Sequence, residues 1–215
     1  MTEYPIIRSG RNNHICPIVE LNRDDFDYVL DGMQKRRNNA QKNHLKPRNG
    51  CLTDNHEGLM QEAMGMAAEV AGQKYLAPIE HHPFLKKFKN IPGLGDIAEL
   101  GSFIDTKQIS KSRDRLIVQI KEEDSRWEWA FLCISSHLVR PNVWPQPYVI
   151  YGWMLGRVAR LYQITDPSYK NRDAYFNEKS LLDDPRELLE LVNIIREIKP
   201  WHILGDGRRD KRVAA

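Results

Sequence analysis

The sequence predicts an α/β or α+β protein built around a mixed β-sheet. An apolar helical segment precedes several short runs rich in Ile, Phe, Leu and Val, and an amphipathic segment follows them. A helix followed by strands is typical of mixed architectures. The chain has 215 residues, of which 41% are hydrophobic, so it can bury one sizeable core. We therefore expect a single main domain with appendages at its ends.

The strongest helix signal spans residues 58–76, with Asp54 or Asn55 as candidate N-cap and Pro78 just past its end. Its first fifteen positions are apolar on almost every face, which indicates a mostly buried helix. Steps of four and three residues place three glycines and two acids on one stripe, namely Gly58, Glu62, Gly65, Glu69 and Gly72. Glycines on a stripe indicate close approach of another element, and a buried carboxylate needs a partner or a metal. The alternative is that this stripe faces solvent.

Five short segments after this helix are rich in strand-forming residues. They are Ile97–Leu100, Ser102–Ile109, Leu116–Ile120, Ala130–Ser135 and Tyr148–Leu155. After a polar stretch, a second helix is predicted over Pro185–Ile198, with Asp184 as its N-cap and proline at its first position.

We expect three parts in the chain. Residues 1–53 form a basic helical extension, residues 54–165 form the core, and residues 166–215 form a helical segment that packs on the core and ends in a frayed tail.

Composition narrows the class of protein. No apolar run approaches the ~20 residues that a membrane span needs, and the start lacks a secretory hydrophobic region. We expect a soluble protein of the cytoplasm, in a bacterial or phage-infected cell. Cys16, Cys51 and Cys133 are odd in number and widely spaced, which fits neither a disulfide framework nor a Cys-x-x-Cys metal site.

The net charge of +3 is too small to indicate nucleic-acid binding by itself, but the basic residues cluster. One run without an intervening acid contains Lys35, Arg36, Arg37, Lys42, Lys46 and Arg48. Interleaved asparagines add hydrogen-bonding groups that suit a phosphate backbone. The ordinary interpretation is a solvated helix face. Further candidate DNA contacts are Lys86, Lys87, Lys89, Lys111 and Arg113.

The segment around Asp105 and Lys107 is the most informative for chemistry. Strand alternation places both side chains on one face, ~6 to 7 Å apart along the strand. A turn at Gly101 would fold Asp96 back beside Asp105 as a hairpin. Two carboxylates suit a hard divalent cation such as Mg²⁺, and a nearby lysine can counter charge on a phosphate. The ordinary interpretation is a surface ion pair on a strand.

The order of these short motifs resembles the PD-(D/E)XK nuclease superfamily. The matching residues are Gly58 and Glu62 on a helix, then Gly95 and Asp96, then Asp105 and Lys107. The arrangement is similar to phage-borne or prophage-borne members, which place an Arg- and Asn-rich helix ahead of the Glu helix. Those members also carry a late strand that ends in Gly-Trp, as at Trp153.

The resemblance implies a central mixed sheet flanked by helices, with a restriction-endonuclease-like core. It implies that Asp96 and Asp105 hold Mg²⁺ or Mn²⁺, that Lys107 is the catalytic lysine, and that Glu62 is the helix acid, with Glu69 as its substitute. The implied activity is hydrolysis of DNA that leaves 5′-phosphates. Gly95 replaces the proline of the motif, and Asp105 is the less frequent choice over Glu. A catalytically silent nuclease-fold protein that binds nucleic acid or a protein partner is the alternative, and a homo-oligomer is compatible with either.

Two other constellations are weaker. His56, His81 and His82 lack the spacing of a zinc site. Cys133 with His137 is a poor nucleophilic pair, because Cys133 stands in an apolar run that reads as a buried strand.

Overall fold

The computed structural model describes residues 4–42, 56–76, 104–109, 115–119, 129–136, 144–161 and 174–198. Its strands are β1 (Arg8–Ser9), β2 (His14–Ile15), β3 (Ile18–Leu21), β4 (Ile104–Gln108), β5 (Arg115–Gln119), β6 (Ala130–Ser136), β7 (Gln146–Leu155) and β8 (Ala174–Glu178). Its helices are α1 (Arg23–Lys42), α2 (His56–Leu76), α3 (Gly156–Leu161), α4 (Pro185–Ile198) and the 3₁₀ turn η6 (Lys179–Leu181). No helix in these ranges is long and apolar enough to cross a bilayer.

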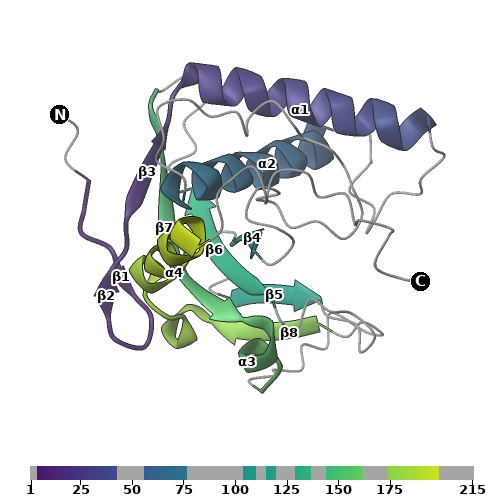
Figure 1. The fold of residues 1–215 in the computed structure, drawn as a ribbon. Coiled ribbons are helices and arrows are strands. Elements are labelled where there is room, and N and C mark those ends of the chain that lie inside the picture. Colours follow the sequence, from purple (N-terminus) through teal and green to yellow (C-terminus); the bar gives the residue numbers. More distant parts are fainter. Residues whose placement is uncertain are drawn as a thin grey trace.

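A four-stranded mixed sheet forms the centre, with the order β3-β7-β6-β4 (Figure 1). β4 runs parallel to β6, and the other two pairs are antiparallel. Two small antiparallel sheets accompany it, β1 with β2 and β5 with β8. The prediction of a mixed α/β fold is therefore confirmed.

Each face of the central sheet has its own hydrophobic cluster. The first cluster joins α2 to residues of alternate sheet positions, including Ile104, Ala130, Leu132 and Ile134, and also takes in Leu188 of α4. The second cluster contains Ile109, Trp129, Phe131, Cys133, Met154, Ala159 and Leu182. We call these the α2 face and the Phe131 face. The two sets alternate along β6, as side chains of a strand must.

α2 lies directly against the sheet, and its glycines explain how. A Cβ added to Gly72 would lie 2.9 Å from Thr106 Oγ1 and 3.2 Å from Ile134 Cδ1. Such a distance leaves no room for a side chain, so the close approach expected of the glycine stripe is confirmed at Gly72. Gly65 has only Gln108 Oε1 within reach, at 3.9 Å.

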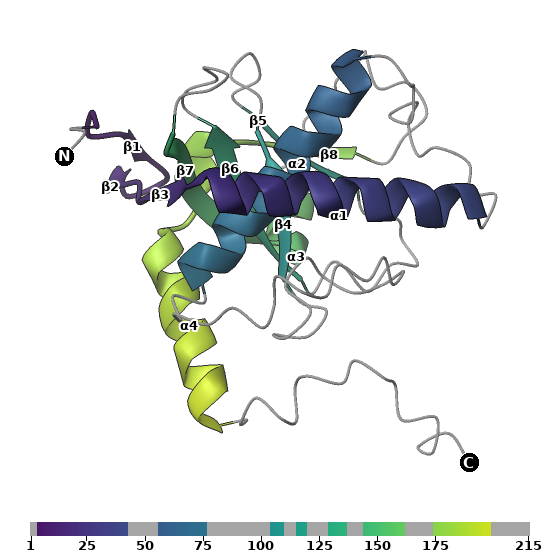
Figure 2. The ribbon, with the colours of Figure 1, turned by 90° about the horizontal axis from the view of Figure 1, so that it is seen from above.

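α1 packs against α2 on the side away from the sheet (Figure 1) and crosses it at an angle (Figure 2). Asn22 and Asp25 form a reciprocal cap at its start, in which each side chain accepts the other's backbone N–H, at 2.9 and 2.8 Å. Lys74 Nζ then donates to Asp25 Oδ2 at 2.7 Å and to the Glu20 carbonyl at 3.1 Å. The beginning of α1 is thereby fixed to the end of α2.

The N-terminal segment contributes a strand, β3, to the central sheet. β3 pairs with β7 from Ile18 opposite Val149 to Leu21 opposite Gln146, and Leu21 is fully buried. A four-residue strand gives little periodicity, so the sequence did not reveal it. β8 was also missed, and it pairs with β5.

Most predicted elements agree with the structure. α4 has the predicted bounds, and α2, β4, β5, β6 and β7 begin or end within two residues of them. The predicted strand at residues 97–100 lies outside the described residues.

Candidate functional site

The centre of the candidate site is an ion pair within β4. Lys107 Nζ lies 2.5 Å from Asp105 Oδ2. The Asp105 side chain is 9% exposed and that of Lys107 is 30% exposed. The carboxylate is therefore buried beneath an amine that reaches toward solvent.

Alternation in β4 explains why the two side chains meet, and their neighbours identify the face. In the parallel register Asp105 is opposite Phe131, and Lys107 is opposite Cys133. Lys107 Nζ also lies 5.8 Å from the centroid of the Phe131 ring. The pair thus lies on the Phe131 face, and β4 is one of the two edge strands of the described central sheet.

Cys133 lies beside this pair and is fully buried. Burial raises the pKa of its thiol, and the ammonium groups of Lys107 and Lys179 oppose that rise. A thiol in this environment stays protonated and unreactive near neutral pH. This agrees with the expectation that Cys133 is not a nucleophile.

The two acids of α2 belong to the other face. Gly65 and Gly72 on the same stripe approach Gln108 and Thr106, whose side chains alternate with those of Asp105 and Lys107. Glu62 and Glu69 are both half-buried on this stripe. The structure therefore separates them from the Asp105–Lys107 pair by the thickness of the strand.

Other predicted site residues fall into two groups. Asp96, Lys46, Arg48, Lys86, Lys87, Lys89, Lys111 and Arg113 lie outside the described residues. Lys35, Arg36, Arg37 and Lys42 lie in the second half of α1, in the layer beyond α2 (Figure 2). The basic half of α1 and the Asp105–Lys107 pair are thus on opposite sides of the sheet.

A divalent cation needs several oxygen ligands, and the described part of the chain offers no group of three or more acidic, His or Cys side chains. Asp105 is the predicted metal ligand that the structure places beside Lys107. The other metal ligand predicted beside it, Asp96, lies outside the described residues. The described residues alone do not fit a metal site.

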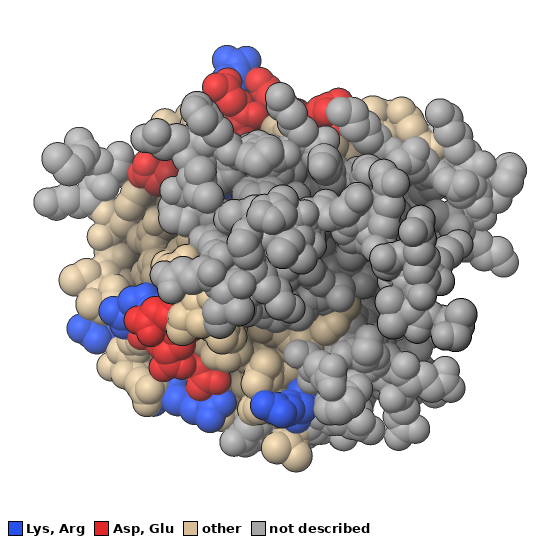
Figure 3. All heavy atoms as spheres, viewed as in Figure 1, with Lys and Arg blue, Asp and Glu red and all other residues tan. Residues whose placement is uncertain are grey.

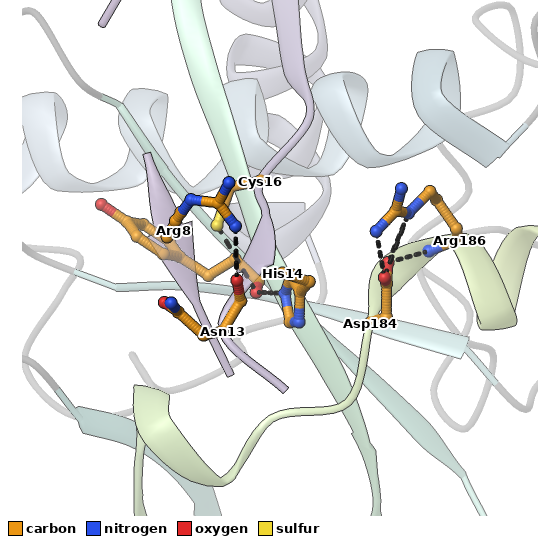
Figure 4. A network of polar contacts seen from close by, with 7 residues as sticks. Arg8, Asn13, His14, Cys16, Asp184 and Arg186 are labelled. Atoms are coloured by element: carbon orange, nitrogen blue, oxygen red, sulfur yellow. Dashed lines mark hydrogen bonds and ion pairs between the residues drawn. The ribbon is translucent and has the colours of Figure 1, made fainter. Parts of the chain in front are cut away.

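A second polar cluster, which sequence reasoning missed, joins the N-terminal hairpin to β7 (Figure 4). His14 is 5% exposed, and its Nε2 donates to the Tyr151 carbonyl at 2.8 Å. Cys16 Sγ lies 3.9 Å from the same oxygen, and burial, followed by the charge of Asp184, raises its pKa to about 11. In sequence, the turn residues Gly10 and Asn13 are the local signal of this hairpin, whereas its partners in β7 are more than a hundred residues away.

The hairpin turn also holds the segment that follows β8. The Arg11 backbone N–H donates to the Leu182 carbonyl at 3.0 Å, and its Nε donates to the Leu181 carbonyl at 3.0 Å. Arg11 Nε lies 3.2 Å from Asp183 Oδ1. Trp153 and Asp183 exchange backbone hydrogen bonds at 3.1 and 2.9 Å, which fixes this segment to β7.

The visible surface carries charges of both signs. Acidic side chains gather near the top of Figure 3, where Figure 1 places α1, and acidic and basic groups adjoin one another lower on the same view. The described residues on this side therefore form a mixed surface.

Comparisons of the chain with models of known protein families, with curated proteins and with solved structures gave no match.

Proposed function

We propose that this chain is a metal-dependent nuclease of the PD-(D/E)XK type that hydrolyses DNA phosphodiester bonds, has a restriction-endonuclease-like core and is phage-encoded. The observation that carries the proposal is the Asp105–Lys107 pair, with 2.5 Å between carboxylate and amine on β4, an edge strand of the central sheet. The proposal does not depend on Glu62 and Glu69, the two acids of α2.

The roles follow from the chemistry of each group. The Lys107 ammonium, which is partly exposed, can offset the negative charge that grows on phosphate oxygens during hydrolysis. Asp105 offers a hard oxygen ligand, and Asp96 is the candidate for the second. Mg²⁺ or Mn²⁺, when bound, would neutralise the phosphate and lower the pKa of a water.

DNA is the proposed substrate because basic residues cluster in the sequence. The run that begins in α1 at Lys35 supplies several cations without an intervening acid. Such a run attaches to phosphates irrespective of base sequence. Since α1 lies beyond α2, its contacts serve to hold flanking DNA and not the phosphate that is cut.

The first experiment measures cleavage of plasmid and single-stranded DNA with Mg²⁺ or Mn²⁺. Lys107→Ala and Asp105→Asn are expected to lower the rate by about 10²–10³-fold, the effect of removing one group that stabilises developing charge. EDTA should abolish cleavage. Glu69→Gln and Glu62→Gln serve as matched controls, because both remove a carboxylate from the opposite face, and each should retain most of the activity.

Circular dichroism and thermal unfolding of every variant establish that it is folded. Cleavage that survives both Asp105→Asn and Lys107→Ala would reject the site. A loss with Glu62→Gln as large as that with Asp105→Asn would reject the assignment of the α2 acids to a separate face.

A second candidate function is a catalytically silent nuclease-fold protein that binds nucleic acid or a protein partner. One observation favours it: the Asp105 carboxylate is already compensated by Lys107, and the nearest predicted acids of α2 lie on the other face. Binding of DNA by the wild-type protein without cleavage in either metal would identify this function.

A further inference from the structure

The side of α1 that points away from α2 is exposed along the helix. No described element lies over this side in Figure 2. Val29 is fully buried on the inner side, whereas exposed residues recur on the outer side at steps of three and four. They are Asp24, Asp27, Leu30, Gln34 and Asn38.

The charges of α1 are divided between its two halves. Its first ten residues contain four aspartates and one arginine, and its last ten contain four cations and no acid. Asp25 is buried and pairs with Lys74 Nζ at 2.7 Å, so it belongs to the inner side, whereas the other three aspartates are exposed. An acidic first half and a basic second half also suit the helix dipole, so this division alone indicates no partner.

The spacing of the charges is more specific than the helix dipole requires. Four charged positions on one side of the helix follow one another at steps of seven, four and seven residues. They are Asp24, Asp31, Lys35 and Lys42. The positions are symmetric about residue 33, next to the middle of α1, and the charges on the two sides of it are opposite. The pattern is therefore complementary to its own reverse.

We propose that this side of α1 binds α1 of a second copy of the chain in the antiparallel direction. About a two-fold axis at residue 33, Asp24 of each copy lies opposite Lys42 of the other, and Asp31 lies opposite Lys35. Such an interface is isologous, so every contact occurs twice. The charges determine the direction, because a parallel pair would place like charges opposite one another.

The interface depends mainly on charge. Of the exposed large hydrophobic residues in the described part of the chain, α1 contributes Leu30, which is 44% exposed. Ion pairs at an exposed surface are individually weak, and salt screens them. We therefore expect a weak dimer that dissociates as the salt concentration rises. Asp31 also has an interaction within its own chain, so the outer pair of Asp24 with Lys42 is the one to test.

This inference goes beyond the proposed function and does not depend on it. Lys35 and Lys42 are also among the cations proposed to hold flanking DNA, so the experiment is performed without DNA. Sedimentation equilibrium of the full chain measures the dissociation constant of the dimer in about 0.1 M and about 1 M NaCl, between which the Debye length falls from about 10 Å to about 3 Å. The wild type is expected to dimerise at the lower salt concentration and to dissociate at the higher one.

Two single substitutions test the outer pair. Asp24→Lys and Lys42→Asp each replace two attractive pairs of the dimer with two repulsive ones, and each should weaken dimerisation by at least about tenfold. An equimolar mixture of the two variants restores the complementarity, because a chain with lysine at both positions then meets a chain with aspartate at both. With one variant labelled by a fluorophore, the mixture should form a mixed dimer about as stable as the wild-type dimer.

Glu187→Lys is the matched control, because Glu187 is an exposed acid in the first turn of α4, as Asp24 is in α1. It should leave the dissociation constant unchanged, and circular dichroism establishes that every variant is folded. A wild type that stays monomeric at the lower salt concentration, or a dimer equally stable at both, would overturn the inference. An Asp24→Lys dimer as stable as wild type, an equal weakening by Glu187→Lys, or a mixture without mixed dimers would overturn it as well.

Discussion

Asp184 combines two functions at the start of α4. Its Oδ1 accepts the backbone N–H of Arg186 at 3.0 Å, which caps the helix, and the Arg186 guanidinium donates to both carboxylate oxygens. The side-chain hydrogen bond from Arg186 holds the pKa of Asp184 below its ordinary value of 3.8, against a smaller opposing effect of burial. An acid whose pKa is lowered on folding stabilises the native state above its unfolded pKa, and this contribution is lost as the pH falls through the folded pKa.

Asp184→Ala should therefore lower the free energy of unfolding at pH 7 by about 1 kcal/mol, the usual cost of losing an N-cap. The difference from wild type should narrow as the pH falls below about 4, because the Asp184 carboxylate is then protonated first in the unfolded state and, at lower pH, in the native state. Urea unfolding at several pH values measures this. Asp184→Asn keeps a capping oxygen and isolates the charge, and a difference that is constant with pH would contradict the prediction.

Residue-level chemistry could be predicted only where local geometry fixes it. Asp105 and Lys107 are two positions apart on a strand, so their side chains must share a face, and the ion pair confirms that they do. The placement of Glu62 and Glu69 depends on which face of the sheet α2 covers. No local pattern encodes that choice, because both faces are apolar.

Two glycines of α2 show how much the packing of a helix against a sheet varies from one position to the next. Gly65 and Gly72 are one heptad apart on the same stripe, and both lie above β4. Gly72 lies within contact distance of Thr106, Ile134 and Leu132, whereas Gly65 has a single neighbour at 3.9 Å. The stripe is therefore closely packed against the sheet at Gly72 and loosely packed at Gly65.

We expect opposite effects from the two matched alanine substitutions. Gly72→Ala should destabilise the protein by about 1–3 kcal/mol, since its methyl group overpacks the helix–sheet contact. Gly65→Ala should stabilise it by up to about 1 kcal/mol, because alanine favours the helix and meets only an ordinary contact. Denaturant unfolding of both variants tests this, and destabilisation by Gly65→Ala would contradict the packing described.

Helices whose ends carry an N-cap residue or a proline were predicted well from sequence, and strands of two to four residues were not. α4 begins at Pro185 after the capping Asp184, and its predicted bounds are correct. β1 and β2 contain two residues each, and β3 contains four. Their stability comes from pairing and from the distant contacts of Arg11 and His14, which no sequence window contains.

At the scale of the whole molecule, the N-terminal hairpin contacts a segment about 170 residues further along the chain. The turn between β1 and β2 lies against residues 181–183, and Gly10 is at the contact with a φ of +80°. A Cβ at Gly10 would lie 2.1 Å from His14 Cε1 and 2.6 Å from the Leu182 carbonyl oxygen. The N-terminal hairpin therefore packs so closely against residues 181–183 that Gly10 has no room for a side chain.

Gly10→Ala should lower the unfolding midpoint and the free energy of unfolding by more than about 1 kcal/mol, because alanine is strained at this φ and clashes with the segment. Asn13→Gly is the matched control at the other positive-φ position of the turn, and it should change stability by less than about 0.5 kcal/mol. Thermal and urea unfolding measure both. A Gly10→Ala protein as stable as wild type would show that the fit between the β1–β2 turn and residues 181–183 does not contribute to stability.

The pairing of β3 with β7 also determines when the protein can fold during its synthesis. Ile18 leaves the ribosome early, and its partner Val149 follows about 130 residues later. At about 5–20 residues per second, the nascent chain must wait on the order of 10 s before this pair can form. Until then β3, an edge strand of the sheet, has no partner strand. The ribosome-bound chain exposes β3 to other nascent chains.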